Sequence, residues 1–310
     1  MKRRDFFLFI SLGMASCGTV SPKLWANSQP SNQVNNQTTN QPLPNNFSAI
    51  PAGSPLFRFV AIADTGTGTA NQYAVAEAMT AYYRKNPFDF VLLAGDNIYP
   101  NGEIERVEAV FVKPYQTLLN QGIKFYACLG NHDVRTLNGI NQINYRAFNM
   151  TGRYYNFTHQ NLEFFALDTN DPTPWAAQFR WLERQLKQST ATNKIVFGHH
   201  HLYSSGVRGI NRDLIQQLAT ILEKYNVPLY INGHEHHYER TQPIRGTTYL
   251  TCGATSMPRP VGQSSWTAYS TSDLSFAVLD VYPRQIMIRG VNTKNEIFDQ
   301  GVINLPAKSS

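Results

Sequence analysis

Hydrophobic residues beyond residue 55 fall into short runs that alternate with stretches of helical spacing. A short apolar run is typical of a buried strand, and apolar residues three or four apart indicate one face of a helix. We predict strands at residues 56–63, 88–93, 124–129, 194–197 and 227–231, and helices at residues 71–85, 103–120, 175–186 and 214–225. Because strands that alternate with helices build a largely parallel sheet, the pattern predicts an α/β domain.

Other stretches follow a hairpin pattern. Residues 154–157 and 162–167 are predicted to pair, and the end of the chain holds further hairpin strands at residues 247–251, 275–281 and 285–291. These hairpins suggest a second, partly antiparallel sheet. Within the helical stretch 103–120, Pro114 must kink or divide the helix, because proline lacks the N–H group that the helix needs.

Residues 1–26 have the pattern of an export signal, with a basic start, an apolar stretch and then small residues; an ordinary secretory signal would be cleaved near Ala26. The start, Arg3-Arg4-Asp5-Phe6-Phe7, resembles a twin-arginine signal, and Met14-Ala15-Ser16-Cys17 resembles a lipobox in which Cys17 is acylated. An ordinary secretory signal is the alternative. We therefore expect a bacterial protein that is exported, either periplasmic or held on the outer side of the membrane by a lipid anchor.

Residues 27–54 are mostly Asn, Gln, Ser, Thr and Pro and carry no charge, which predicts a disordered tether. The folded domain is then expected to span residues 55–310. The whole chain carries a formal net charge of +6, which favours anionic ligands such as phosphate esters. Because Lys and Arg form no continuous block, we predict no nucleic-acid partner.

Polar side chains follow five of the apolar runs. The carboxyl ends of the strands in an α/β sheet meet at one edge, where ligands bind. We therefore expect two carboxylates, a phenol, an amide and several imidazoles to gather there and to bind metal. The residues are Asp64, Asp96 with Tyr99, Asn131 with His132, His199, and His234 with His236.

These segments resemble, in order, the five motifs of the calcineurin-like metallophosphoesterases. They are Asp64-Thr65-Gly66, Gly95-Asp96-Asn97-Ile98-Tyr99, Gly130-Asn131-His132-Asp133, Gly198-His199 and Gly233-His234-Glu235-His236. The first motif lacks the family's usual histidine, and the second supplies Tyr99 instead, as in the purple acid phosphatases. The resemblance implies their small, single-domain form: a sandwich of two mixed β-sheets flanked by helices (α/β/β/α).

The resemblance also implies a role for each site residue. Asp64, Tyr99 and His236 would bind Fe(III), while Asn131, His199 and His234 would bind a divalent ion (Zn, Fe or Mn), with Asp96 between the two. Hard anionic oxygens suit Fe(III), and imidazole with amide suits a divalent ion. His132 would be the general acid and metal-bound hydroxide the nucleophile. Substrate contacts are expected from His200 and Arg208, for which support of the metal ligands and a solvated loop position are the alternatives.

The predicted function is hydrolysis of small phosphate monoesters by an exported acid phosphatase. A phosphodiesterase with the same centre is one alternative, and a surface protein that binds phosphate or metal without turnover is another. We further predict that Asp133 orients its neighbours and that Cys128 and Cys252 are free buried thiols. The sequence names neither the physiological ester nor the oligomeric state.

Overall fold

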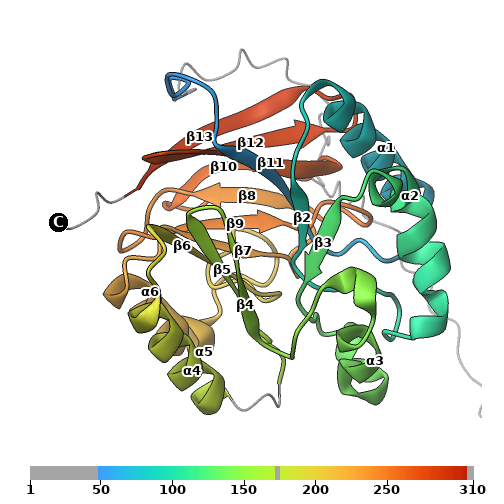
Figure 1. Cartoon of the computed structure of the whole chain (residues 1–310), viewed down its shortest axis with the longest axis horizontal. Helices are drawn as coiled ribbons and strands as arrows, with labels where there is room; N and C mark the ends of the chain where they lie inside the picture. The colour runs from blue at the N-terminus through green and yellow to red at the C-terminus, as the bar shows by residue number, and fades with distance from the viewer. Residues whose placement is uncertain (1–47, 172–174, 306–310) are drawn as a thin grey trace, which may run out of the picture. The chain divides into compact units, whose positions relative to one another are not determined.

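A computed structural model describes residues 48–171 and 175–305, which form two β-sheets packed face to face (Figure 1). The predicted export signal and most of the predicted tether lie outside these residues, so both remain predictions. Within the described ranges, no helix combines the length and apolar character needed to cross a membrane.

The first sheet joins strands from both ends of the domain. Its order is β13-β12-β11-β1-β2-β3. β1, β2 and β3 run parallel, whereas β11, β12 and β13 form antiparallel pairs, and β11 pairs antiparallel with β1. The bounds are β1 Phe57–Ile62, β2 Phe90–Leu93, β3 Lys124–Ala127, β11 Ser275–Tyr282, β12 Gln285–Asn292 and β13 Ile297–Asn304.

The second sheet has the order β10-β8-β9-β7-β6-β5-β4. Its centre, β5, β6, β7 and β9, is parallel, and its edges are antiparallel. The bounds are β4 Tyr155–His159, β5 Leu162–Ala166, β6 Asn193–Phe197, β7 Leu229–Asn232, β8 Tyr238–Thr241, β9 Thr248–Cys252 and β10 Thr267–Thr271.

Helices cover the outer face of each sheet (Figure 1). α1 Ala70–Lys85 and α2 Lys113–Asn120 lie beside the first sheet, and α4 Trp175–Gln188, α5 Arg212–Leu214 and α6 Thr220–Lys224 lie beside the second. The result is the α/β/β/α sandwich. The shorter helical turns are η1 Ile104–Arg106, η2 Glu108–Val112, η3 Asp133–Arg135, η4 Leu137–Gly139, α3 Ile140–Ile143, η5 Arg146–Phe148 and η6 Ile215–Ala219.

Alternate residues of the central strands face different cores. On β6, Ile195 and Phe197 pack into the core that includes both sheets, while Val196 packs with α4 and α6 on the other face. Stacked rings join the two sheets in the first core: the Phe59 and Phe90 rings lie 5.2 Å apart, and Phe164 of the opposite sheet meets Phe90 edge-on at 5.4 Å. This burial on both faces explains why these strands are continuous apolar runs.

The C-terminal hairpins were expected to build the second sheet, and this prediction is wrong for β11 and β12. Both extend the first sheet, because the fully buried β11 pairs along β1. Sequence periodicity cannot reveal such a pairing between distant segments. β8, β10 and β13 were not predicted. Pro114 lies in the first turn of α2, and η2, directly before α2, is a π-helical turn, so the helix changes its hydrogen-bond spacing there and does not end.

Candidate metal centre

The loops after β1, β2, β3, β6 and β7 bring all seven predicted metal ligands to one edge of the sandwich. Asp64 and Asp96 follow the parallel neighbours β1 and β2, Asn131 follows β3, and the three histidines follow β6 and β7. The two carboxylates and His199 are completely or almost completely buried. A buried group of ionisable side chains requires compensation by protons or cations.

Three of these residues have left-handed backbones: Asp64, Asp96 and His234 have φ angles of 56°, 53° and 68°. This conformation is unfavourable for most residues with a side chain, and three such residues in one cluster indicate a backbone held in place by its surroundings. The loop after β3 passes so close to Asp96 that it has no room for a side chain at Gly130. A Cβ on Gly130 would lie 2.2 Å from Oδ1 of Asp96, so a glycine is needed where the β3 loop passes that carboxylate.

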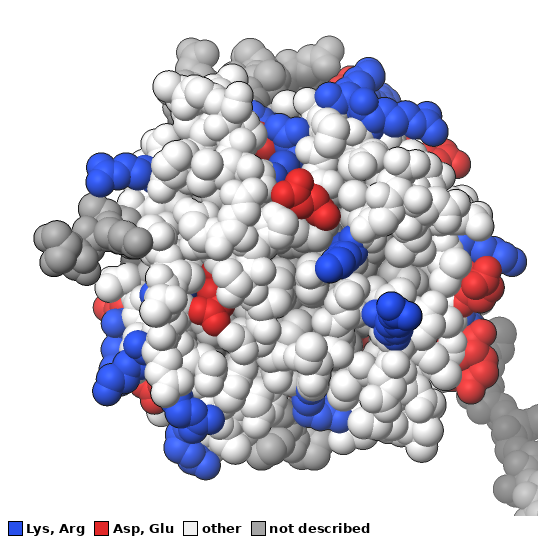
Figure 2. All heavy atoms as spheres, in the orientation of Figure 1, with Lys and Arg blue, Asp and Glu red and all other residues white. Residues whose placement is uncertain are grey.

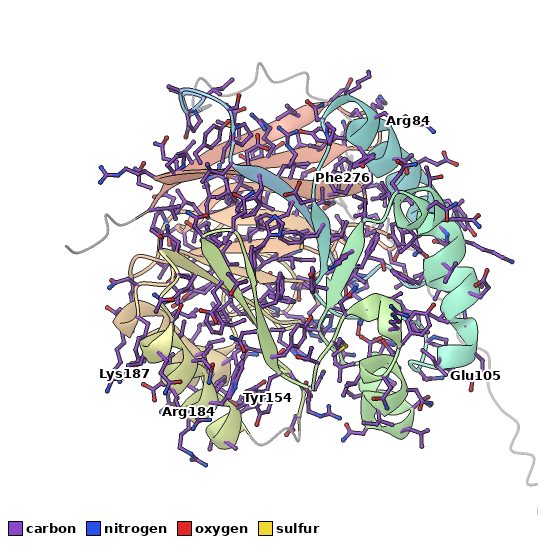
Figure 3. All side chains as sticks on the ribbon, viewed as in Figure 1. Arg84, Glu105, Tyr154, Arg184, Lys187 and Phe276 are labelled. Atoms are coloured by element: carbon purple, nitrogen blue, oxygen red, sulfur yellow. The ribbon has the colours of Figure 1, made fainter. Side chains whose placement is uncertain are left out.

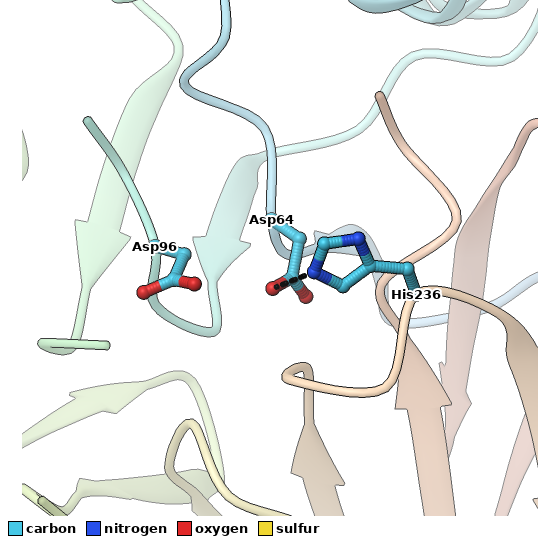
Figure 4. Close-up of side chains that lie close together, drawn as sticks. All are labelled: Asp64, Asp96 and His236. Atoms are coloured by element: carbon cyan, nitrogen blue, oxygen red, sulfur yellow. Dashed lines mark ion pairs between the residues drawn. The ribbon is translucent and has the colours of Figure 1, made fainter. Parts of the chain in front are cut away.

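The first group of donors surrounds the Tyr99 hydroxyl. That oxygen lies 3.1 Å from Oδ1 of Asp64, 2.8 Å from Oδ2 of Asp96 and 3.3 Å from Nε2 of His236. Asp64 and His236 approach each other to 3.3 Å (Figure 4). Donor atoms of Asp64, Asp96 and His236 lie within 4.8 Å of one another, as in a metal site.

The second group adjoins the first through Asp96. Oδ1 of Asn131 lies 2.8 Å from Nδ1 of His234 and 3.1 Å from Nε2 of His199, and the two ring nitrogens are 3.2 Å apart. Oδ2 of Asp96 lies 3.5 Å from Nε2 of His199, so this carboxylate contacts both groups. The arrangement offers two adjacent positions for cations with one shared carboxylate.

Backbone carbonyls orient two of the rings. Nδ1 of His199 donates to the Ala94 carbonyl at 3.0 Å, and Nδ1 of His236 donates to the Met257 carbonyl at 2.9 Å. Because a carbonyl only accepts, Nδ1 carries the proton in each ring, and in the neutral ring Nε2 presents a lone pair to the centre. Lone pairs and carboxylate oxygens at about 3 Å repel one another unless a positive charge lies between them, so the donor set fits bound cations.

The pKa shifts of the side chains in the centre also indicate an excess of negative charge. Burial opposes protonation of His199 and His236, yet the nearby carboxylates raise the pKa of both. Burial also opposes ionisation of Asp64, but His236 lowers its pKa overall. Burial and the carboxylates of Asp64 and Asp96 raise the pKa of Tyr99 far above its ordinary value. A Tyr99 phenolate therefore requires a highly charged cation at this position.

His132 lies beside the first donor group, and its ring centroid is 4.4 Å from that of Tyr99. Its backbone N–H donates to Oδ1 of Asp96, and its Nδ1 donates to the Pro100 carbonyl at 2.6 Å. The Arg135 guanidinium, which sequence reasoning missed, reaches Nε2 of His132 at 3.3 Å. Guanidinium groups only donate, so Nε2 accepts from Arg135 in this structure and faces the side of the ring that Pro100 leaves open.

Below this loop, the buried carboxylate of Asp133 accepts hydrogen bonds from the backbone of Asn97, Ile98 and Gly130 and from the Gln142 amide. It thus ties the second motif to the third, which is the orienting role predicted for it. Burial and the charge of Asp96 raise the pKa of Asp133 to about 7. Cys128 and Cys252 are buried free thiols, as predicted.

The two predicted substrate contacts differ in exposure. The His200 ring lies 4.4 Å from that of His234, and its Nδ1 is 2.9 Å from the Thr169 hydroxyl. The Arg208 side chain is 49% exposed, and its Nε lies 3.4 Å from Oε1 of the fully buried Glu235. Glu235 was not predicted to take part, although its place between His234 and His236 was the available signal.

The metal-free protein should lose stability in mild acid. Burial, His237 and Arg208 lower the pKa of His201 from 6.5 to about 4. As the pH falls, His201 therefore binds a proton in the unfolded chain before it does so in the folded protein. The contribution of the neutral ring to the free energy of unfolding is complete above pH 6.5 and is lost as the pH falls towards 4. His201 alone contributes up to about 3 kcal/mol of this loss. Urea unfolding of chelator-treated protein at several pH values measures it, and His201→Gln should flatten the curve. Parallel curves for both proteins would contradict the assignment.

The Calcineurin-like phosphoesterase family matches residues 57–238. Purple acid phosphatase 7 of Arabidopsis thaliana is 32% identical over 231 residues, which cover 64% of this chain and 70% of that protein. Among solved structures, GAP50, the anchor in the inner membrane complex of Plasmodium, superposes with a TM-score of 0.72 at 23% identity, covering 82% of this chain and 90% of that one. A purple acid phosphatase from yellow lupin seeds gives a TM-score of 0.66 at 18% identity, covering 83% of this chain and 55% of that one.

The structural matches establish the fold, and the sequence matches establish the relationship. The segment that the family matches contains all five loops that carry the donor residues. With its donor-lined edge and its sandwich of two mixed sheets, the chain belongs to the calcineurin-like phosphoesterases, and its relatives in that family include purple acid phosphatases.

Proposed function

We propose that this protein is an exported acid phosphatase that hydrolyses phosphate monoesters at a binuclear Fe(III)–M(II) centre. The observation that carries the proposal is the Tyr99 hydroxyl, which lies within 3.3 Å of donor atoms on Asp64, Asp96 and His236. A phenolate with two carboxylates suits Fe(III) better than a divalent ion. Asn131, His199 and His234 would hold the divalent ion, which is Zn, Fe or Mn.

Ions held by these residues would supply Lewis-acid chemistry, since a metal pair can orient a phosphoryl group and lower the pKa of water. The side chains set the charge of the site: two carboxylates and one phenolate offset three of the five positive charges. A net charge of about +2 then attracts a monoester dianion more strongly than a diester monoanion. This difference favours monoesters over the alternative phosphodiesterase activity.

The chain itself supplies the proton. Pro100 fixes the ring of His132 through Nδ1, which leaves Nε2 to carry a proton to the leaving oxygen. In this structure the Arg135 guanidinium donates to Nε2 of His132. A bound substrate would have to displace this guanidinium before Nε2 could contact the leaving oxygen. Arg208, anchored on Glu235, and His200 are proposed to contact the phosphate oxygens.

Export is part of the proposal because the predicted signal lies at residues 1–26. We expect the twin-arginine-like start to direct a folded, metal-loaded protein across a bacterial membrane, and Cys17 to receive a lipid. Labelling with a radioactive fatty acid, compared with Cys17→Ser, would test the anchor.

Tyr99→Phe is the direct test of the iron site. The wild-type protein should contain iron and absorb visible light through the phenolate–iron bond, whereas the variant should lose the absorption. Metal analysis and a visible spectrum measure both. Tyr238→Phe is a suitable control, because this tyrosine is also buried but donates to Asp299 on β13 of the opposite sheet, away from the donor groups. If the wild-type protein were colourless but still hydrolysed esters, the proposed phosphatase activity would stand and the proposed iron site would be wrong.

Activity on p-nitrophenyl phosphate and on its bis ester decides between the enzymatic alternatives. We expect the monoester to be the better substrate by kcat/KM. A faster diester would reverse the proposal. Metal-loaded protein that binds phosphate but hydrolyses neither ester would instead be a binding protein that keeps the fold, and GAP50, described as an anchor, shares the fold.

A further inference from the structure

A second cavity lies away from the metal centre, between the end of α1 and the outer strands of the first sheet. Its volume is about 340 Å³, which lies within the usual range for small-molecule pockets, about 300–1,000 Å³. Arg58 at the start of β1 lines it, whereas Asp64 follows the end of that strand. Six residues of extended chain separate the two sites by roughly 20 Å, so the cavity is not part of the metal centre.

The cavity has an excess of positive charge. Arg58, Arg289 and Lys85 line it, and none of the described lining residues is acidic. Beneath them, the buried carboxylate of Asp280 accepts hydrogen bonds from both Arg58 and Arg289. The end of α1 adds about half a negative charge. Three cations therefore face one carboxylate and a helix terminus, and a net charge between +1 and +2 remains.

The two guanidinium groups are held in place. Their side chains are only 16% and 12% exposed, and Arg58 lies 5.9 Å from the centre of the Tyr82 ring. Arg58 also donates to the Pro87 carbonyl at 3.3 Å, and Nε of Arg289 donates to Gln300 at 3.4 Å. Asp280 neutralises only one of the two guanidinium charges, so an anionic ligand would offset the positive charge that remains.

Polar and apolar groups complete the cavity. Three amide side chains, Asn86, Asn295 and Gln300, also line the cavity. At the mouth, Ile50 and Ile297 are 65% and 38% exposed. Figure 2 shows basic side chains in a hollow near the top of the view, where Figure 1 places the start of β1 and the end of α1.

From these observations we propose that this cavity binds a phosphate group, either as free inorganic phosphate or as the headgroup of an anionic phospholipid. Rigid guanidinium groups match the geometry of phosphate oxygens, and Lys85 adds a mobile charge at the rim. The amide side chains can bond to polar groups of a ligand, and the exposed Ile50 and Ile297 suit the acyl chains of a phospholipid. The proposal does not depend on the activity of the metal centre.

Lys85→Glu tests the proposal with little risk to folding, because Lys85 is an exposed residue at the last position of α1. The matched control is Arg84→Glu, an equal charge change on the adjacent exposed residue of α1, which does not line the cavity (Figure 3). Calorimetric titration of the purified full chain with inorganic phosphate should detect two sites. We expect Lys85→Glu to weaken one of them at least tenfold and Arg84→Glu to leave both unchanged.

Flotation with phosphatidylcholine vesicles, with and without an equal part of phosphatidylglycerol, distinguishes a phospholipid headgroup from free inorganic phosphate as the ligand. Binding that requires phosphatidylglycerol and is lost only in Lys85→Glu identifies the headgroup, while a second site in the phosphate titration alone identifies free phosphate. A single phosphate site together with equal vesicle binding by both variants would overturn the proposal. Arg289→Lys, which keeps the charge beside Asp280 but loses the planar fork, should weaken whichever ligand binds.

Discussion

Asp96→Asn is expected to lower kcat/KM for p-nitrophenyl phosphate by roughly a thousandfold or more and to remove most of the bound metal. Oδ2 of Asp96 accepts the Tyr99 hydroxyl at 2.8 Å and lies 3.5 Å from Nε2 of His199, so one carboxylate serves both donor groups. Asparagine has the same shape, but its neutral oxygen cannot hold two cations together. Metal analysis and steady-state kinetics on the same preparation measure the two effects.

Asp168→Asn provides a matched control for this substitution. Asp168 is also a buried carboxylate, but it pairs with Arg153 and Asn170, neither of which is a predicted ligand. We expect the variant to retain its metal and most of its activity, although the lost ion pair lowers its stability. If Asp96→Asn kept both ions and full activity, the carboxylate between the two donor groups would not be a shared ligand.

Sequence reasoning located the donor residues because their signal is local. Each is a polar residue within a few positions of the end of a buried apolar run, and the carboxyl ends of neighbouring strands converge on one edge of a sheet. Tyr99 follows Asp96 by three residues, and the turn between them returns its hydroxyl to the same carboxylate. The alternation of strands and helices predicted the α/β class for the same local reason.

The remaining features depend on contacts between distant segments. β11 pairs with β1 across more than two hundred residues, and no periodicity in either strand specifies that partner. The contact between Arg135 and His132 exists because the Pro100 carbonyl, from another loop, holds both side chains. Glu235 is charged and would be expected at the surface, yet it is completely buried. Such placements follow from tertiary packing rather than from residue type.

His132→Ala is expected to lower kcat/KM by about a hundredfold to ten-thousandfold for an alkyl ester such as glycerol phosphate. An alkoxide leaves poorly without a proton, and we propose that Nε2 of His132 supplies it once the substrate has replaced Arg135. The loss should be much smaller for p-nitrophenyl phosphate, because nitrophenolate is stable without protonation. Comparing the two esters therefore isolates proton transfer from binding.

Metal content separates this role from a structural one. Only the backbone N–H of His132 contacts Asp96, and alanine keeps that hydrogen bond, so both ions should remain bound. His159→Ala serves as the control, since that ring lies at the end of β4 and is paired with Asp89. Equal losses on the two esters, or loss of metal in proportion to activity, would mean that His132 maintains the centre. A loss confined to the alkyl ester would mean that Nε2 of His132 donates the proton to the leaving oxygen.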